Sequence, residues 1–154
     1  MIENREKVLA VLNEILELEL AGVVRYTHYS LMIFGHARIP IAKWFRDEAT
    51  ESLDHAVQAG EYVTSFGGHP SLAIGKLLET HKHDINDILE ESIEHETHGI
   101  NKYRELLGLV EGKDIRLEEY ARGMVMEEEN HLSEIEKMLR RPGETTPVAA
   151  PPKG

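Results

Sequence analysis

The 154-residue chain carries 17 basic and 28 acidic residues, which gives a formal net charge of −11. This balance argues against nucleic-acid binding and against an anionic membrane surface as partner, because both need a basic protein surface. The absence of cysteine excludes disulfides, thiolate metal sites and cysteine nucleophiles. No segment is apolar enough to span a membrane and the N-terminal residues lack an apolar signal core, so we expect a cytoplasmic protein.

Apolar residues recur about every 3.6 positions over four long stretches, and we therefore expect four helices. The predicted helices span about residues 4–34, 40–66, 85–112 and 115–140. Asp84 and Asp114 are predicted to cap the third and fourth helices, and Pro40 suits the first turn of the second.

The connection between the second and third predicted helices is long. An apolar run from Leu72 to Leu78, interrupted by Gly75, is compatible with a short helix inside it. A short loop makes two helices antiparallel neighbours, whereas a long one lets the next helix start at the far end of a bundle. We therefore predict a crossover there. Residues 1–140 are expected to form one helical bundle, and the Pro/Ala-rich residues 141–154 a flexible tail.

The chain repeats two of its segments. One segment carries Glu, Gly and Tyr at the same spacing twice, as Glu19, Gly22 and Tyr26 and again as Glu96, Gly99 and Tyr103. A second repeat follows almost in step, with Arg46, Glu51 and His55 matched by Arg122, Glu127 and His131. Repetition of this kind predicts two related helical hairpins packed about a pseudo-two-fold axis.

Residues three, four or seven apart share one face of a helix. Four such pairs can face the bundle interior together: Glu19 with Tyr26, Glu51 with His55, Glu96 with Tyr103, and Glu128 with His131. Isolated buried carboxylates cost several kcal/mol or take up protons, so bound cations best explain such a set. Mixed carboxylate and imidazole ligation suits Fe(II), Mn(II) or Zn(II), and the pattern predicts a dinuclear metal site.

From about Val8 to Leu139 the chain resembles the bacterioferritins, in the ferritin-like superfamily of di-iron carboxylate proteins. The resemblance implies an all-α, antiparallel four-helix bundle with a long crossover between helices two and three. It also implies that Glu19 and Glu96 are the single Glu ligands of helices one and three. Tyr26 then lies where the family has a tyrosine beside the metal centre, as a hydrogen-bond or electron donor.

Helix two departs from the family pattern. The family has Glu three residues before the ligand His, and that position here is Ser52. Glu51 lies four residues before His55 and can reach the same helix face, so we predict Glu51 and His55 as ligands. Ser52 and Asp54 remain alternatives.

In helix four, Glu128 and His131 match the family's Glu-x-x-His motif, and Glu127 is an alternative to Glu128. The predicted metal ligands are Glu19, Glu51, His55, Glu96, Glu128 and His131, and the predicted catalytic residues are Glu19, Glu51, Glu96, Glu128 and Tyr26.

Two further departures bear on haem and on assembly. Bacterioferritins bind haem through a Met two residues before the helix-two His, and Leu53 stands at that position, so we expect no haem. The Pro/Ala-rich tail replaces a short fifth helix that lines a channel of the family's 24-subunit shell. We expect a homo-oligomer built from dimers. The sequence does not decide whether the dimers assemble into a larger shell. His81 and His83 are interpreted as surface residues rather than as a second metal site.

The resemblance implies a ferroxidase that oxidises Fe(II) with O₂ or H₂O₂, for iron storage or detoxification. Its cofactor would be a di-iron centre, with manganese or zinc as alternatives. A second hypothesis is a non-storage di-metal redox enzyme of the peroxidase or manganese catalase type. A third is a structural bundle that binds no metal.

Overall fold

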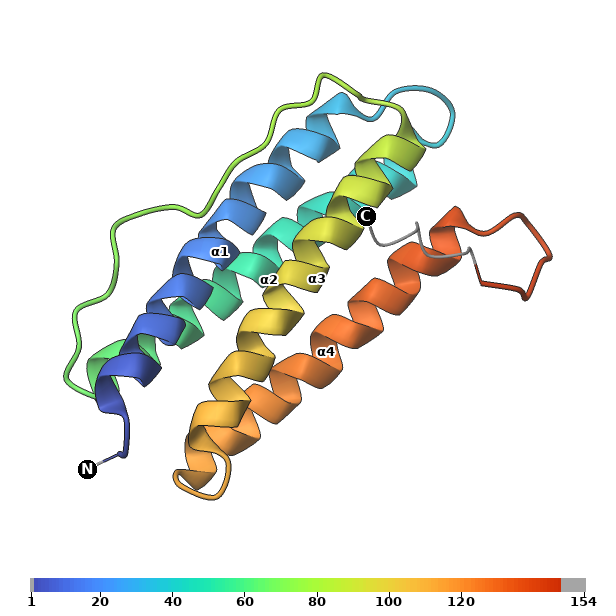
Figure 1. The fold of residues 1–154 in the computed structure, drawn as a ribbon. Coiled ribbons are helices and arrows are strands. Elements are labelled where there is room, and N and C mark those ends of the chain that lie inside the picture. The colour runs from blue at the N-terminus through green and yellow to red at the C-terminus, as the bar shows by residue number, and fades with distance from the viewer. Residues whose placement is uncertain (1, 148–154) are drawn as a thin grey trace.

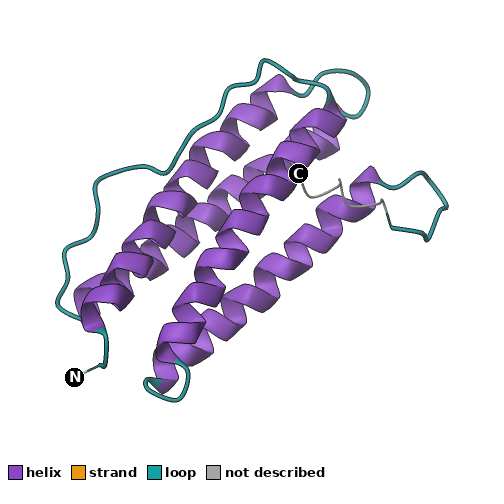
Figure 2. Cartoon of the chain, viewed as in Figure 1, coloured by secondary structure: helices purple, strands orange, loops and turns teal. Residues whose placement is uncertain are grey.

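The computed structural model describes residues 2–147, and four long helices make up most of them (Figure 1). They are α1 (Arg5–Met32), α2 (Arg38–Ser65), α3 (Ile85–Val110) and α4 (Ile115–Leu139). Loops join the helices, and the described residues contain no strand (Figure 2). The predicted all-α four-helix bundle is confirmed. Residues 141–147 are exposed, and the remainder of the predicted tail lies outside the described residues.

The two predicted Asp caps are also confirmed. The Asp84 carboxylate accepts a hydrogen bond from the Asn86 N–H at 2.9 Å, at the start of α3. The Asp114 carboxylate accepts one from the Leu117 N–H at 2.9 Å, at the start of α4. Each bond satisfies a backbone donor that the first helical turn leaves without a partner, a contribution of about 1 kcal/mol.

The helices pack as two antiparallel hairpins, α1 with α2 and α3 with α4, and α1 also packs against α3. The apolar core consists of two clusters. One lies at the end of the bundle that holds Leu12, Val63, Leu106 and Leu117, and the other at the end that holds Phe45, Ile88 and Ile135. Between them lies a band of buried polar side chains, namely Glu19, Glu48, Ser52, His55, Glu96 and Glu128. The apolar clusters therefore close this band off from water at both ends of the bundle.

The connection between α2 and α3 is a crossover that runs along the outside of α1, from one end of the bundle to the other (Figure 1). It is held by hydrogen bonds to α1. The Ser71 N–H donates to the Asn13 side chain at 2.9 Å, and the Gly75 N–H donates to the Glu17 carbonyl at 2.8 Å.

The short helix considered for Leu72–Leu78 does not form, because the segment's backbone bonds to α1 instead of to itself. A Cβ atom at Gly75 would lie 2.9 Å from the Glu17 carbonyl oxygen, which is closer than side chains tolerate. The glycine that interrupts the apolar run therefore allows the crossover to lie close against α1. Within the described residues, no helix combines the length and apolar composition that a membrane span needs.

Candidate metal centre

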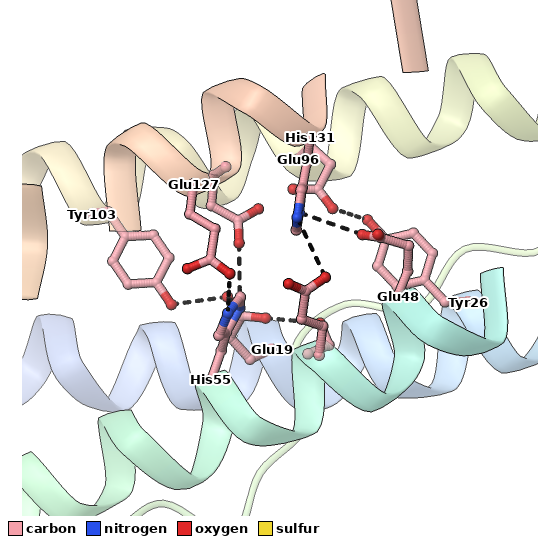
Figure 3. A network of polar contacts seen from close by, with 11 residues as sticks. Glu19, Tyr26, Glu48, His55, Glu96, Tyr103, Glu127 and His131 are labelled. Atoms are coloured by element: carbon pink, nitrogen blue, oxygen red, sulfur yellow. Dashed lines mark hydrogen bonds and ion pairs between the residues drawn. The ribbon is translucent and has the colours of Figure 1, made fainter. Parts of the chain in front are cut away.

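Side chains from the middle of all four helices meet in the polar band between the two core clusters. Figure 3 shows Tyr103 at one end of this group, Tyr26 at the other, and carboxylates and imidazoles between them. Five of the six predicted ligands face the same interior region, and the sixth, Glu51, lies at its edge.

The first group of possible ligands comes from α1, α2 and α4. His55 Nδ1 lies 3.6 Å from Glu19 Oε1 and 3.3 Å from Glu128 Oε1. All three side chains are less than a tenth exposed. One ligand atom from each of the three residues lies within 4.8 Å of the other two, a spacing that a single cation could bridge.

The second group comes from α3 and α4, and it includes Glu128 again. The ligand atoms of Glu96, Glu128 and His131 also lie within 4.8 Å of one another. Glu128 is thus common to both groups. A carboxylate has two oxygens, so Glu128 can contact two neighbouring cations at once.

Glu48 is a site residue that the sequence interpretation missed. Its carboxylate is buried and lies 3.4 Å from His131 Nδ1, on the inner side of that ring. Glu48 precedes His55 by seven residues, so the two share one face of α2. The seven-residue spacing was the signal in the sequence that could have identified Glu48. It is weaker than the Glu-x-x-His motif, because it does not distinguish Glu48 from the other Glu residues of the helix.

Glu51 and Glu127 occupy equivalent outer positions. Glu51 lies 3.3 Å from His131 Nε2, and Glu127 lies 3.2 Å from His55 Nε2. Both carboxylates are more than a third exposed. A carboxylate at Nε2 favours a proton there and leaves Nδ1, on the inner side, available to a cation. The structure therefore puts Glu51 at the outer edge of the cluster and gives α2 a second candidate ligand in Glu48.

The two alternatives that the sequence left open in helix two lie differently. The Ser52 hydroxyl donates a hydrogen bond to Glu19 Oε2 at 2.7 Å, so it orients a carboxylate. Space for this bond exists because residue 22 is glycine, where a Cβ would lie 2.4 Å from Ser52 Oγ. Asp54 is exposed and belongs to none of the groups of possible ligands among the described residues.

Each buried tyrosine holds the Glu of the other hairpin. The Tyr103 hydroxyl donates to Glu19 Oε1 at 2.9 Å, and the Tyr26 hydroxyl donates to Glu96 Oε1. Burial, followed by the charges of these carboxylates, raises the pKa of both tyrosines, so they remain hydrogen-bond donors at neutral pH. This crossed arrangement is the structural counterpart of the Glu–Tyr repeat in the sequence.

Burial and the neighbouring charges raise the pKa values of several side chains in the cluster, so these side chains retain their protons. Burial, with the charges of Glu96 and Glu51, raises the pKa of Glu48 to about 8. Burial and the neighbouring Glu96 side chain also raise the pKa of Glu128. Burial by itself lowers the pKa of His55, but contacts with Glu128 and Glu19 outweigh it and raise the pKa to about 11. Without a cation, the cluster therefore holds protons at neutral pH.

Two observations indicate that the donor set fits bound cations. His55 Nδ1 is fully buried and has no well-aligned hydrogen-bond partner, although two carboxylate oxygens lie nearby. A cation between these atoms would satisfy the nitrogen and both carboxylates together. In addition, α2 and α4 have no Cα pair within 8 Å along their described lengths, so only side chains join them.

Comparison with known proteins gives consistent results. The family model of the ferritin-like domain matches residues 9–142. A solved structure described as a ferritin-like, diiron-carboxylate protein from Bacillus anthracis is 22% identical, with a TM-score of 0.84, and the match covers 91% of this chain and 100% of that one. No curated protein sequence matches the chain.

Two more solved structures share the fold. A dodecameric thioferritin, the bacterioferritin-related protein of Bacteroides fragilis, is 23% identical with a TM-score of 0.82, covering 88% of this chain and 86% of that one. The Rhodobacter capsulatus bacterioferritin, described with a metal-free dinuclear site and haem iron, is 23% identical with a TM-score of 0.81, covering 90% and 86%. At these identities the likeness establishes the fold.

Proposed function

Because this chain belongs to the ferritin-like domain family, we propose that it is a ferroxidase that oxidises Fe(II) to Fe(III) at a dinuclear centre, for iron storage or detoxification. One observation carries the proposal. Glu128 is shared between the Glu19–His55 group and the Glu96–His131 group, so two cations bound there would be neighbours. Neighbouring cations can deliver two electrons to one oxidant.

In the proposed reaction, Glu19 and His55 would hold one Fe(II), Glu96 and His131 would hold the other, and the Glu128 carboxylate is available to both. Glu48 supplies the carboxylate that Ser52 cannot provide. The two Fe(II) ions lose one electron each. H₂O₂ accepts both electrons with two protons and becomes two water molecules, or O₂ accepts them with two protons and becomes H₂O₂.

The chain's own residues would prepare the site for this reaction. Tyr103 and Ser52 fix the orientation of Glu19, and Tyr26 fixes that of Glu96. The apolar clusters on either side limit the entry of water, which strengthens the electrostatic interactions at the centre. Tyr26 is also the nearest candidate for an electron donor on the α3–α4 side, because its hydroxyl touches a ligand of that group.

Stopped-flow oxidation of Fe(II) tests the proposal. An initial fast phase should saturate at about two Fe(II) per chain, one for each group of ligands. Glu19→Ala and Glu128→Ala should abolish this phase. Asp54→Ala is the matched control, because it removes an exposed carboxylate next to His55 and should leave the phase intact. Saturation at no defined stoichiometry, or an unchanged phase in Glu128→Ala, would refute the proposal.

A second candidate function is a di-metal redox enzyme without storage, such as a peroxidase or manganese catalase. The replacement of the helix-two Glu by Ser52, with Glu48 one turn away, favours it because it changes the carboxylates around the second cation. Two measurements separate the candidates. A dimer in solution cannot enclose a mineral, and rapid disproportionation of H₂O₂ by the manganese-loaded protein would identify a catalase.

A further inference from the structure

A second cluster of possible ligands lies outside the polar band, where the end of the crossover meets the last turns of α1. It consists of His28 on α1 with Glu79 and His83 on the crossover. None of these residues belongs to the central site. His28 is two residues after Tyr26 on α1, so its side chain points away from the bundle interior that Tyr26 faces.

The distances within this cluster are those of atoms around one cation. His28 Nε2 lies 3.0 Å from Glu79 Oε2, and His83 Nε2 lies 3.4 Å from Glu79 Oε1. One ligand atom from each residue falls within 4.8 Å of the other two. Ligands at 2.0–2.1 Å around a tetrahedral Zn²⁺ are about 3.4 Å apart, so the observed separations match such a site.

Hydrogen bonding does not account for the arrangement. Both Nε2 atoms are shielded from solvent, although the rings are partly exposed, and neither has a hydrogen-bond partner of acceptable alignment. The carboxylate is close to each nitrogen but not in line with it. A shared cation between the three side chains would satisfy both nitrogens and the carboxylate together.

The surrounding contacts hold the cluster in place. The Thr80 hydroxyl and the Tyr29 hydroxyl both donate to the Glu91 carboxylate of α3, which fixes the crossover against α1 and α3. His81 adopts a left-handed backbone conformation, with φ of 56°, and its N–H donates to Glu79 Oε1 at 2.5 Å. An ordered frame of this kind lowers the cost of assembling ligands from two segments.

We propose that His28, Glu79 and His83 form a mononuclear binding site for a divalent transition-metal ion of the Zn²⁺ type. Two imidazoles and one carboxylate are a common three-residue set for such ions, with the fourth position left to water or to His81. The bound ion joins the crossover to α1. This assignment replaces the interpretation of His83 as an ordinary surface residue, which the sequence favoured because His83 lies at the start of the third predicted helix.

Calorimetric titration of the full-length protein with Zn²⁺ tests the proposal. His28 and His83 each supply one of the three proposed ligand atoms, so His28→Ala and His83→Ala should each lose one Zn²⁺ equivalent while the central site keeps its own. His36→Ala is the matched control, because His36 is an exposed imidazole near the same end of the bundle. Equal stoichiometry in wild type, His28→Ala and His83→Ala would overturn the proposal.

Limited trypsin digestion gives an independent readout that does not depend on the central site. Lys76 and Lys82 lie exposed on the crossover, on either side of Glu79. Zn²⁺ should slow cleavage after these residues in wild type and in Glu128→Ala, but not in Glu79→Gln or His83→Ala. Equal protection by Zn²⁺ in His83→Ala and wild type would contradict a cation held at this cluster.

Discussion

At the scale of single residues, the centre is nearly symmetric, and helix two breaks the symmetry. Glu19 corresponds to Glu96 and His55 to His131 in the two halves of the chain, but Ser52 stands opposite Glu128. One turn earlier, Glu48 places a buried carboxylate 3.4 Å from His131 Nδ1. The cluster therefore keeps an inner carboxylate for His131, with a geometry that differs from the Glu-x-x-His motif of helix four.

This difference separates the roles of two glutamates. Glu48→Gln removes an inner carboxylate and should lower the number of bound Mn²⁺ or Fe²⁺ ions to about one per chain. Glu51→Gln is its matched control, one turn along α2. This variant should retain both ions but bind them about 10–100-fold more weakly, because the Glu51 carboxylate contacts the outer nitrogen of His131. Anaerobic metal titration measures both. Loss of an ion in Glu51→Gln alone would restore Glu51 as the ligand.

The raised pKa values make the metal-free protein sensitive to alkaline pH. Above pH 6.5 the folded chain binds more protons than the unfolded chain, on Glu48, Glu128 and His55. Stability gained this way is lost as pH rises through the folded pKa values. The pKa of Glu48 is about 8 and that of His55 is about 11, so Glu48 releases its proton before His55 does. The free energy of unfolding should therefore fall between pH 7 and 9, by about 1.4 kcal/mol per pH unit for each excess proton.

Urea unfolding of the chelated protein at several pH values measures this slope. The pKa of His95 is lowered to about 4, chiefly by burial, so this residue is neutral in the folded state and mostly neutral in the unfolded state above pH 7, and its opposing contribution is small. Glu48→Gln should show a shallower slope than wild type. A free energy of unfolding that is constant or rising from pH 7 to 9 would show that the cluster does not hold these protons.

At the scale of elements, the crossover is the segment with the least structure of its own. Its order comes from α1, through the Asn13 and Glu17 contacts and the Arg25 guanidinium, which donates to the Lys76 carbonyl at 3.1 Å. The apolar residues Leu72, Ile74 and Leu77 remain exposed on its outer side. The path of the crossover is therefore set by polar backbone contacts rather than by burial of its apolar side chains.

Gly75→Ala should displace the crossover, because the added Cβ would lie 2.9 Å from the Glu17 carbonyl oxygen. Crowding of this kind costs about 1–3 kcal/mol of unfolding free energy. Gly108→Ala is the control, since its Cβ would meet nothing within 4 Å on α3 and should stabilise the helix by up to about 1 kcal/mol. Chemical denaturation compares the two, and equal stability of Gly75→Ala and wild type would show that the close approach is unimportant.

At the scale of the whole molecule, the central cluster joins the two hairpins. The helices α2 and α4 meet only through side chains such as His55 with Glu127 and His131 with Glu51. A cation shared by Glu19, His55 and Glu128 would connect α1, α2 and α4 at once. Metal binding and the stability of the bundle should therefore be coupled.

This coupling predicts a metal-dependent melting temperature. A ligand at 100 times its dissociation constant stabilises the folded state by about 2.7 kcal/mol, which corresponds to roughly 5–11 °C for a domain of this size. Calorimetry of the protein with Mn²⁺ and with a chelator measures the difference. Glu128→Ala should lose most of it. An identical melting temperature with and without metal would favour the third hypothesis, a structural bundle that binds none.

The sequence by itself determined the four helices, the Asp84 and Asp114 caps and the helix face that carries the Glu, His and Tyr residues. These features follow from local spacing, since the 3.6-residue period places side chains on one face whatever the helix packs against. Only the tertiary structure decided that Glu48 faces inward and Glu51 lies at the edge. Glu48 and Glu51 are three residues apart, so their directions on α2 differ by about 60°, and the rotation of the helix within the bundle selects between them.

The path of the crossover and the His28–Glu79–His83 cluster were also decided only by the tertiary structure. Both depend on contacts between segments about 50 residues apart, and no local pattern encodes such a contact. The sequence showed which side chains could act, and the packing of the helices decided which of them meet.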